Sequence, residues 1–120
     1  MKEMQLGTVE ARFADMIWAN EPMSSTALSH MSAEKFGWKK STCYTVLKRL
    51  CDKGLFKNDG GTITSLISRS DFYAAQSEKF VDETFEGSLP AFLAAFTARK
   101  QLTREEVADI RRMIDEYKED

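Results

Sequence analysis

Basic side chains interleaved with hydroxyl groups are the part of this 120-residue sequence that could bind a ligand through charge. Between Lys35 and Lys57 the chain carries seven Lys or Arg residues and a single acidic residue, Asp52. A local net charge of +6 over 23 residues would attract a polyanion such as nucleic acid. A basic run is more commonly just a solvated charged face. Which of these two explanations holds depends on the secondary-structure element that carries the basic residues.

The middle of the basic run predicts an amphipathic helix that Gly54 terminates. When residues are stepped at about 100° each, the apolar side chains share one arc, which holds Cys43, Val46, Leu47, Leu50 and Cys51. The opposite arc is polar and carries Ser41, Thr42, Tyr44, Thr45, Lys48 and Arg49. The sequence thus predicts a helix with one buried face and one polar, basic face.

Two further helices are predicted before this one. Apolar residues at helical spacing occupy positions 6–17, with Thr8 as a candidate N-cap. A second helix can be capped by Ser24 or Ser25 and is closed by Gly37. The basic amphipathic helix would therefore be the third helix of the chain.

A β-hairpin is predicted directly after the third helix. Leu55–Asn58 is typical of a short strand, and Thr62–Ile67 is rich in the β-branched residues of a return strand. Asp59-Gly60-Gly61 between them is a hairpin turn signal, because these residues tolerate a positive φ. Three helices followed by a hairpin is the element order of a winged helix-turn-helix, which we assign to residues 1–69 as a DNA-binding domain.

A helix-turn-helix lays its second helix in the major groove of double-stranded DNA, where residues near the helix start face the base edges. Ser and Thr can donate to or accept from base edges, and an Arg can pair bidentately with guanine or contact a phosphate. Basic residues beyond the helix end would contact the DNA backbone. The candidate DNA-binding residues are Lys39, Lys40, Ser41, Thr42, Tyr44, Thr45, Lys48, Arg49, Lys53 and Lys57.

Residues 70–120 are predicted to be helical and acidic, with seven basic residues against twelve acidic ones from position 71 onward. Ser88 can cap one of these helices, and Thr103 with Glu106 forms a capping box at the start of another. About 50 residues of short helices cannot easily bury a self-sufficient core. Pairing with a second chain would solve this problem, and folding back on residues 1–69 is the alternative. The candidate dimerisation residues are Phe80, Phe85, Leu89, Phe92, Leu93, Phe96, Val107, Ile110 and Ile114.

Several short motifs together resemble the penicillinase-repressor family, which includes the BlaI, MecI and CopY regulators. The motifs are Trp18-Ala19-Asn20-Glu21-Pro22, Gly37-Trp38, Thr45-Val46-Leu47-Lys48-Arg49-Leu50 and Phe85-Glu86-Gly87-Ser88-Leu89. The resemblance implies a homodimeric transcriptional repressor whose winged helix binds a dyad operator and whose C-terminal helices dimerise. It also implies a membrane sensor-protease that detects β-lactam and leads to cleavage of the repressor.

The sequence departs from the family pattern at three places. Positions 22–37 are about four residues longer than in the founding repressors. Lys39-Lys40 replaces an expected Ser-Pro helix start, which moves the predicted cap to Ser41. The founding repressors are cut at an Asn–Phe bond, and the best match here is Ala95-Phe96, so the cleavage step is not carried over to this chain. The Cys-x-Cys pairs of the copper-responsive branch are also missing, which argues against induction by copper.

The composition argues against several other classes of protein. One His and two Cys residues leave little for a metal site, and no catalytic set or cofactor-binding loop is evident, so we expect neither an enzyme nor a cofactor. No apolar run approaches the roughly 20 residues of a membrane helix, and the chain is expected to be cytoplasmic. Cys43 and Cys51 are expected to be core cysteines rather than a redox switch. The remaining alternative to a DNA-binding repressor is a winged-helix module that binds another protein.

Overall fold

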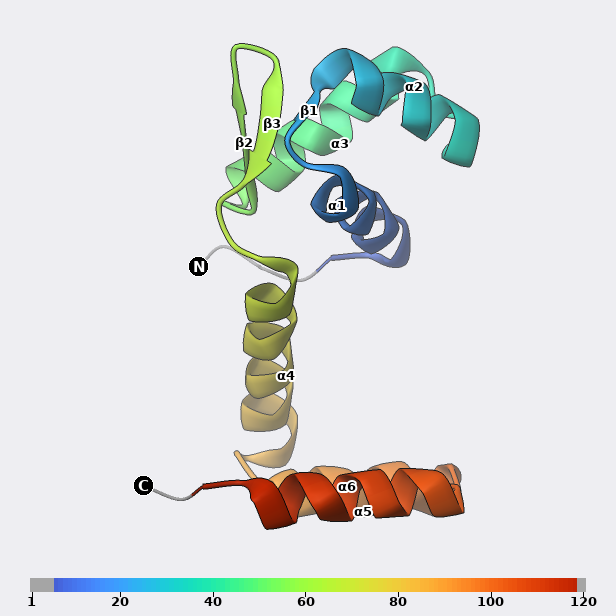
Figure 1. Cartoon of the computed structure of the whole chain (residues 1–120), viewed down its shortest axis with the longest axis vertical. Coiled ribbons are helices and arrows are strands. Elements are labelled where there is room, and N and C mark those ends of the chain that lie inside the picture. The colour runs from blue at the N-terminus through green and yellow to red at the C-terminus, as the bar shows by residue number, and fades with distance from the viewer. Residues whose placement is uncertain (1–5, 119–120) are drawn as a thin grey trace. The chain divides into compact units, whose positions relative to one another are not determined.

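A computed structural model describes residues 6–118 and forms six helices and a small antiparallel sheet within that range (Figure 1). The elements are α1 (Thr8–Asn20), β1 (Met23–Ser24), α2 (Ser25–Phe36), α3 (Lys40–Asp52), β2 (Phe56–Asp59), β3 (Thr62–Ser65), α4 (Arg69–Phe85), α5 (Leu89–Arg99) and α6 (Arg104–Glu116). The predicted winged-helix order, three helices followed by a hairpin, is confirmed. The predicted helical character of the second half is also confirmed.

The chain divides into two compact units, which we call the N-terminal unit (Met1–Ser77) and the C-terminal unit (Glu78–Asp120). The division falls eight residues after the boundary expected from the sequence. The reason is Phe72, which is buried in the core of the N-terminal unit and lies 5.6 Å from Trp18 between ring centroids. The first turns of α4 are therefore part of the winged-helix unit.

Most helix ends of the N-terminal unit follow local signals. The Ser24 hydroxyl accepts a hydrogen bond from the Ala27 N–H at 3.0 Å, which confirms Ser24 as the cap of α2. Gly37 ends α2 with a φ of 71°, in the left-handed region that favours glycine. The predicted cap of α1 at Thr8 is wrong by one residue, because Gly7 holds the extended cap conformation and the helix begins at Thr8.

The predicted hairpin is part of a three-stranded sheet with the strand order β1-β3-β2. The two-residue strand β1, which the sequence analysis missed, pairs with β3 through Met23↔Ile63 and Ser24↔Thr62. The return strand ends at Ser65 rather than at Ile67. The Glu21 carboxylate accepts both the Ser65 N–H (2.7 Å) and the Ser65 hydroxyl (2.8 Å), which ties the end of β3 to the segment that follows α1.

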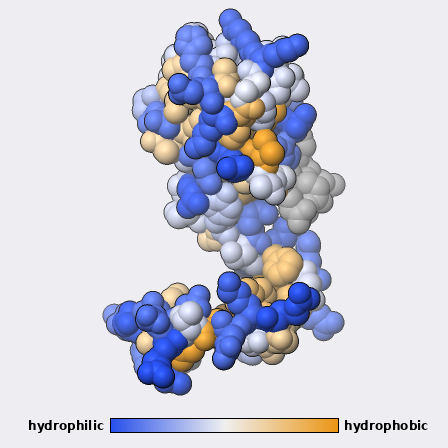
Figure 2. Space-filling model, turned by 90° about the vertical axis from the view of Figure 1, so that its right-hand side faces the viewer, coloured by the Kyte–Doolittle hydropathy of each residue, from blue (hydrophilic) through white to orange (hydrophobic). Residues whose placement is uncertain are grey.

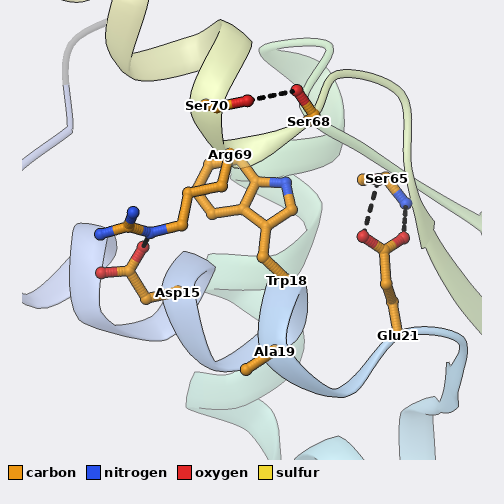
Figure 3. Close-up of a pocket in the computed structure, with 8 residues that line it drawn as sticks. All are labelled: Asp15, Trp18, Ala19, Glu21, Ser65, Ser68, Arg69 and Ser70. Atoms are coloured by element: carbon orange, nitrogen blue, oxygen red, sulfur yellow. Dashed lines mark hydrogen bonds and ion pairs between the residues drawn. The ribbon is translucent and has the colours of Figure 1, made fainter.

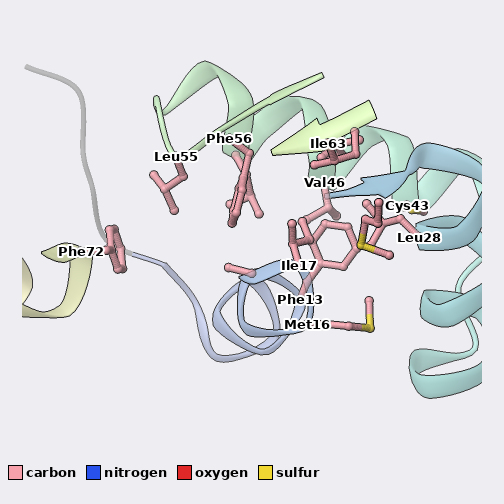
Figure 4. Packing of buried hydrophobic residues seen from close by; sticks show 14 residues of the cluster. Phe13, Met16, Ile17, Leu28, Cys43, Val46, Leu55, Phe56, Ile63 and Phe72 are labelled. Atoms are coloured by element: carbon pink, nitrogen blue, oxygen red, sulfur yellow. The ribbon is translucent and has the colours of Figure 1, made fainter. Parts of the chain in front are cut away.

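A single apolar core holds the winged helix together (Figure 4). Phe13 and Ile17 of α1 are fully buried against side chains from α2, α3 and the sheet. Trp18 lies at the edge of this core, where its ring contacts Phe56 at 5.1 Å and its Nε1 donates to the Ile67 carbonyl at 3.0 Å. Burial of these apolar side chains stabilises the winged helix, and it fixes the faces that α1 and α3 leave to solvent.

Candidate nucleic-acid interface

Helix α3 presents the two faces that the sequence predicts. Its buried residues are Cys43, Val46, Leu47 and Leu50. On the other face Ser41, Thr42, Thr45, Lys48 and Arg49 are exposed, and Tyr44 is half-buried. Ser41, Thr45 and Lys48 are spaced by four and three residues, so they form one stripe along the middle of the exposed face. This stripe is narrow and polar, as a surface that enters the major groove must be.

The N-terminal end of α3 is electropositive and uncapped. Lys39 occupies the N-cap position with an extended backbone, and no side chain hydrogen-bonds the first amides of the helix. The predicted cap at Ser41 is therefore wrong: the helix has already begun at Lys40, so Ser41 lies within its first turn. Lys39 and Lys40 are both exposed, and Lys40 Nζ lies 5.7 Å from the centroid of the Tyr44 ring. Open amides and two ammonium groups together form a site that favours phosphate.

Cations in the C-terminal half of α3 are paired with carboxylates of the protein. Lys48 lies 3.4 Å from Asp52 in the same helix, and both side chains are largely exposed. Arg49 Nη1 and Lys53 Nζ both pair with Glu10 of α1, at 3.1 and 3.5 Å. Asp52 and Glu10 thus partly neutralise the positive charge at the C-terminal end of α3. Neither carboxylate pairs with Lys39 or Lys40 at its N-terminal end.

Glu10 is a residue that the sequence analysis did not connect with the basic helix. Burial alone would raise the pKa of its carboxyl group, but the hydrogen bond from the Gly7 N–H and the charges of Arg49 and Lys53 lower it overall. Glu10 is therefore ionised at neutral pH. It lies 39 positions before Arg49 in the chain, and no local pattern in the sequence indicates such a contact.

The hairpin of β2 and β3 is the wing, and it carries one of the predicted DNA contacts. Lys57 on β2 is exposed. The turn is closed by a hydrogen bond from the Gly61 N–H to Asn58 Oδ1 at 2.9 Å, and Gly60 and Gly61 adopt the positive φ values that the turn requires. A polar hollow of about 370 Å³ between α3 and the wing is lined by Tyr44, Leu47, Lys48, Cys51, Asp52 and Asn58.

A second polar hollow in the N-terminal unit, of about 690 Å³, lies between α1, the end of β3 and the start of α4 (Figure 3). Its charged side chains pair with neighbours within the hollow. Arg69 Nε donates to Asp15 at 2.8 Å, which raises the pKa of the guanidinium group, and Glu21 binds Ser65 as described above. This arrangement braces the start of α4 against α1, because its donors and acceptors satisfy one another.

The C-terminal unit has an apolar surface. Neither α5 nor α6 has a fully buried side chain. The rings of Phe80, Phe85, Phe92 and Phe96 lie close together, with centroid distances between 5.7 and 6.1 Å for the contacting pairs. A hollow of about 850 Å³ shared by α5 and α6 is lined by Leu89, Leu93, Ile110, Met113, Ile114 and Tyr117. Hydrophobic side chains at the surface of this unit are bordered by hydrophilic ones in Figure 2.

All of the predicted dimerisation residues except Val107 line this hollow or belong to the phenylalanine cluster. Phe80, Leu89, Phe96 and Ile114 are exposed. Phe85, Phe92, Leu93, Val107 and Ile110 are half-buried. Ser88 and Thr103 cap α5 and α6 as predicted, and Glu106 completes the capping box of α6. These caps fix the residue at which each helix begins. The start of the helix in turn determines which apolar side chains lie together on one face.

Comparison with known proteins decides the family. The model of the penicillinase repressor family matches residues 6–116, nearly the whole chain. The chain belongs to the penicillinase repressor family. A penicillinase repressor from Bacillus licheniformis is 24% identical to it over 118 residues, which cover 95% of this chain and 92% of that protein. As a member of this family, the chain is a DNA-binding transcriptional repressor with a winged-helix fold and not an enzyme.

Metal binding, membrane spanning and proteolysis are the remaining properties on which the structure bears. Within residues 6–118 no group of three or more His, Cys, Asp or Glu side chains is placed to hold a metal ion. Over the same part of the chain, no helix combines the length and apolar character needed to cross a lipid bilayer. The Ala95–Phe96 bond, which is the best match to the family's cleavage site, lies inside α5.

Both cysteines of the repressor are free thiols, and burial raises the pKa of each. A raised pKa means a smaller fraction of reactive thiolate at a given pH. We therefore expect iodoacetamide at pH 8 to modify Cys43 and Cys51 of the folded repressor at least about tenfold more slowly than glutathione in the same tube. Peptide mass spectrometry over time measures both rates. Modification of Cys51 at the glutathione rate would contradict this prediction and support a redox role.

Proposed function

We propose that this repressor binds a dyad operator as a homodimer and reads base edges with the N-terminal half of α3. The observation that carries the proposal is the uncapped, electropositive start of α3, directly beside an exposed stripe of hydroxyl side chains. Phosphates suit the open amides and the two lysines, and base edges suit the hydroxyls. The two kinds of contact lie within two turns of one helix, as major-groove recognition requires.

Each DNA-contacting group has a role that follows from its chemistry. Ser41, Thr42 and Thr45 contact base edges, where a hydroxyl can donate or accept and a Thr methyl can meet a thymine methyl. The Thr45 hydroxyl donates to the Ser41 carbonyl at 2.9 Å, so its orientation is fixed while its oxygen can still accept. Lys39 and Lys40 contact phosphates at the helix start. Lys48 lies further along the exposed stripe, and Tyr44 and Lys57 flank it. These three side chains supply further contacts to the DNA backbone.

A second copy of this chain is the partner that best fits the apolar surface of the C-terminal unit. The surface joins exposed Leu89, Ile114 and Tyr117 to the half-buried Leu93 and Ile110. Contiguous apolar surface of this kind marks an interface in most proteins. A two-fold dimer would bury the same surface on both copies, and it would also match the symmetry of a dyad operator. We place the repressor in the cytoplasm, where its DNA target lies.

The proposal is tested by the mass of the repressor in solution and by its binding to DNA at one fixed salt concentration. The DNA is taken from immediately upstream of the repressor's own gene, and a scrambled fragment of equal length is the control. We expect a dimer that prefers the upstream fragment. A monomer, or a dimer without preference, would favour the alternative in which the winged helix binds another protein through its basic face.

A further inference from the structure

One carboxylate of α1, that of Glu10, holds two cations at the C-terminal end of α3: Arg49 in its last turn and Lys53 at its C-cap. Glu10 Oε2 accepts a hydrogen bond from Arg49 Nη1 at 3.1 Å, and Glu10 Oε1 lies 3.5 Å from Lys53 Nζ. Oε1 also accepts the Gly7 N–H at 3.2 Å, so the carboxylate is fixed in the first turn of α1. Each oxygen thus has its own cation, and the Glu10 side chain is only 17% exposed.

These contacts add a directional restraint on α3 to the packing of the apolar core. Burial of apolar surface is non-directional, so it does not hold α3 to one particular partner atom. Charge-assisted hydrogen bonds have preferred distances and angles. Arg49 and Lys53 are four residues apart, about 6 Å along the axis of a regular helix, and attachment at two points resists both rotation and translation of α3.

Arg49 and Lys53 lie to one side of the α3 residues that face DNA in our proposal. Ser41, Thr45 and Lys48 form the exposed stripe. Arg49 lies about 100° round the helix from Lys48 and about 40° from Thr45, at the edge of the stripe, where it contacts Glu10 of α1. The Lys53 side chain is 16% exposed, whereas that of Lys48 is 78% exposed. Arg49 and Lys53 therefore face α1, and the lysines at the start of α3 remain for contact with phosphate.

We propose that Glu10 is a positioning residue that sets the pose of the recognition helix through Arg49 and Lys53, and that these two cations serve this contact rather than DNA phosphates. The inference rests on the proposed function, because the pose matters only if α3 reads bases. Base contacts depend on the position of each hydroxyl, whereas phosphate contacts by long lysine side chains tolerate small displacements. Loss of the contact should therefore reduce binding to the operator more than binding to unrelated DNA.

Three variants test the role of Glu10: Glu10→Gln, Arg49→Gln and the double variant. Affinity is measured for operator and scrambled DNA over a range of salt concentrations, and the melting temperature is measured in parallel. We expect each single variant to lose about tenfold in operator affinity, the amount one charge-assisted hydrogen bond can supply. Affinity for scrambled DNA should change less than about twofold, and the slope of affinity against salt should stay the same. The double variant should bind no more weakly than Glu10→Gln alone, because Glu10→Gln already removes the ionic contact with Arg49.

Glu34→Gln is the matched control, because it removes the same charge from an exposed position on α2. It should bind both DNAs like the unaltered repressor. Arg49 is half-exposed, so Arg49→Gln should retain the fold even if Glu10→Gln does not, and the Arg49 result is then sufficient.

Other outcomes would overturn the inference. A salt slope reduced by about one in Arg49→Gln would make Arg49 a phosphate contact. Unchanged operator affinity with only a lower melting temperature would make Glu10 purely structural. Tighter binding by Glu10→Gln would mean that Glu10 withholds cations from DNA. Failure of the unaltered repressor to prefer operator DNA is seen before any variant is compared, and it would overturn the proposed function together with this inference.

Discussion

Replacing Ile114 by aspartate is expected to convert the proposed dimer into a monomer. Ile114 is 65% exposed in the isolated chain and lines the apolar hollow between α5 and α6. In a two-fold dimer the substitution occurs twice, and each copy loses about 2 kcal/mol of apolar burial and places a charge in an apolar interface. The dissociation constant of the dimer should therefore rise by at least about a thousandfold, which sedimentation over a range of concentrations measures.

The same variant should lose most of its affinity for a dyad operator, because a monomer engages only one half-site at a time. Leu66→Asp is the control for the mass measurement: Leu66 is an exposed apolar residue of similar accessibility (58%), but it lies in the N-terminal unit. It should leave the dimer intact. An Ile114→Asp protein that still dimerises with the original dissociation constant would show that another surface forms the dimer.

Removing the two lysines at the start of α3 is expected to weaken binding to every DNA sequence alike. If Lys39 and Lys40 each neutralise one phosphate, Lys39→Ala with Lys40→Ala should lower the slope of log affinity against log salt by about 1.8. At 0.15 M salt the same relation predicts a loss of about thirtyfold, on operator and scrambled DNA equally. Fluorescence anisotropy at four or more salt concentrations measures both quantities.

Arg99→Ala with Lys100→Ala is the matched control, because it removes two positive charges from exposed positions at the end of the α5 region. Its salt slope should equal that of the unaltered repressor, provided that its mass in solution shows a dimer. If the slope of log affinity against log salt is unaffected by loss of Lys39 and Lys40, the phosphate contacts do not lie at the start of α3. A loss confined to operator DNA would instead make one of the two lysines a base contact.

The parts of the fold that could be predicted depend on signals close together in the chain. The caps at Ser24, Ser88 and Thr103 are hydroxyls that reach an amide three residues later, and the cap at Gly37 is a residue that tolerates a positive φ. The buried arc of α3 follows from helical periodicity alone. The sequence predicted these features because each is decided within about one or two turns of chain.

The features that could not be predicted depend on partners far away in the chain. Strand β1 has only two residues, and it exists because Met23 and Ser24 lie beside β3, about 40 positions later. The contact between Glu21 and Ser65 spans 44 positions of the chain, and the contact between Glu10 and Arg49 spans 39. The candidate interface was therefore predicted as a set of polar residues on α3, but the division of its cations between the two ends of the helix required the structure.

The uncapped start of α3 has a consequence for how binding and folding are linked. A missing N-cap side chain costs a helix about 1 kcal/mol and leaves its first turn prone to fraying. Here that turn is the one that would meet DNA. A phosphate bound there would satisfy the same amides that a capping hydroxyl satisfies in α2, so the nucleic acid would complete the helix that reads it. Part of the binding free energy would then offset the cost of ordering the first turn of α3. In the free repressor that turn, which begins at Lys40, would be the least ordered part of the recognition helix.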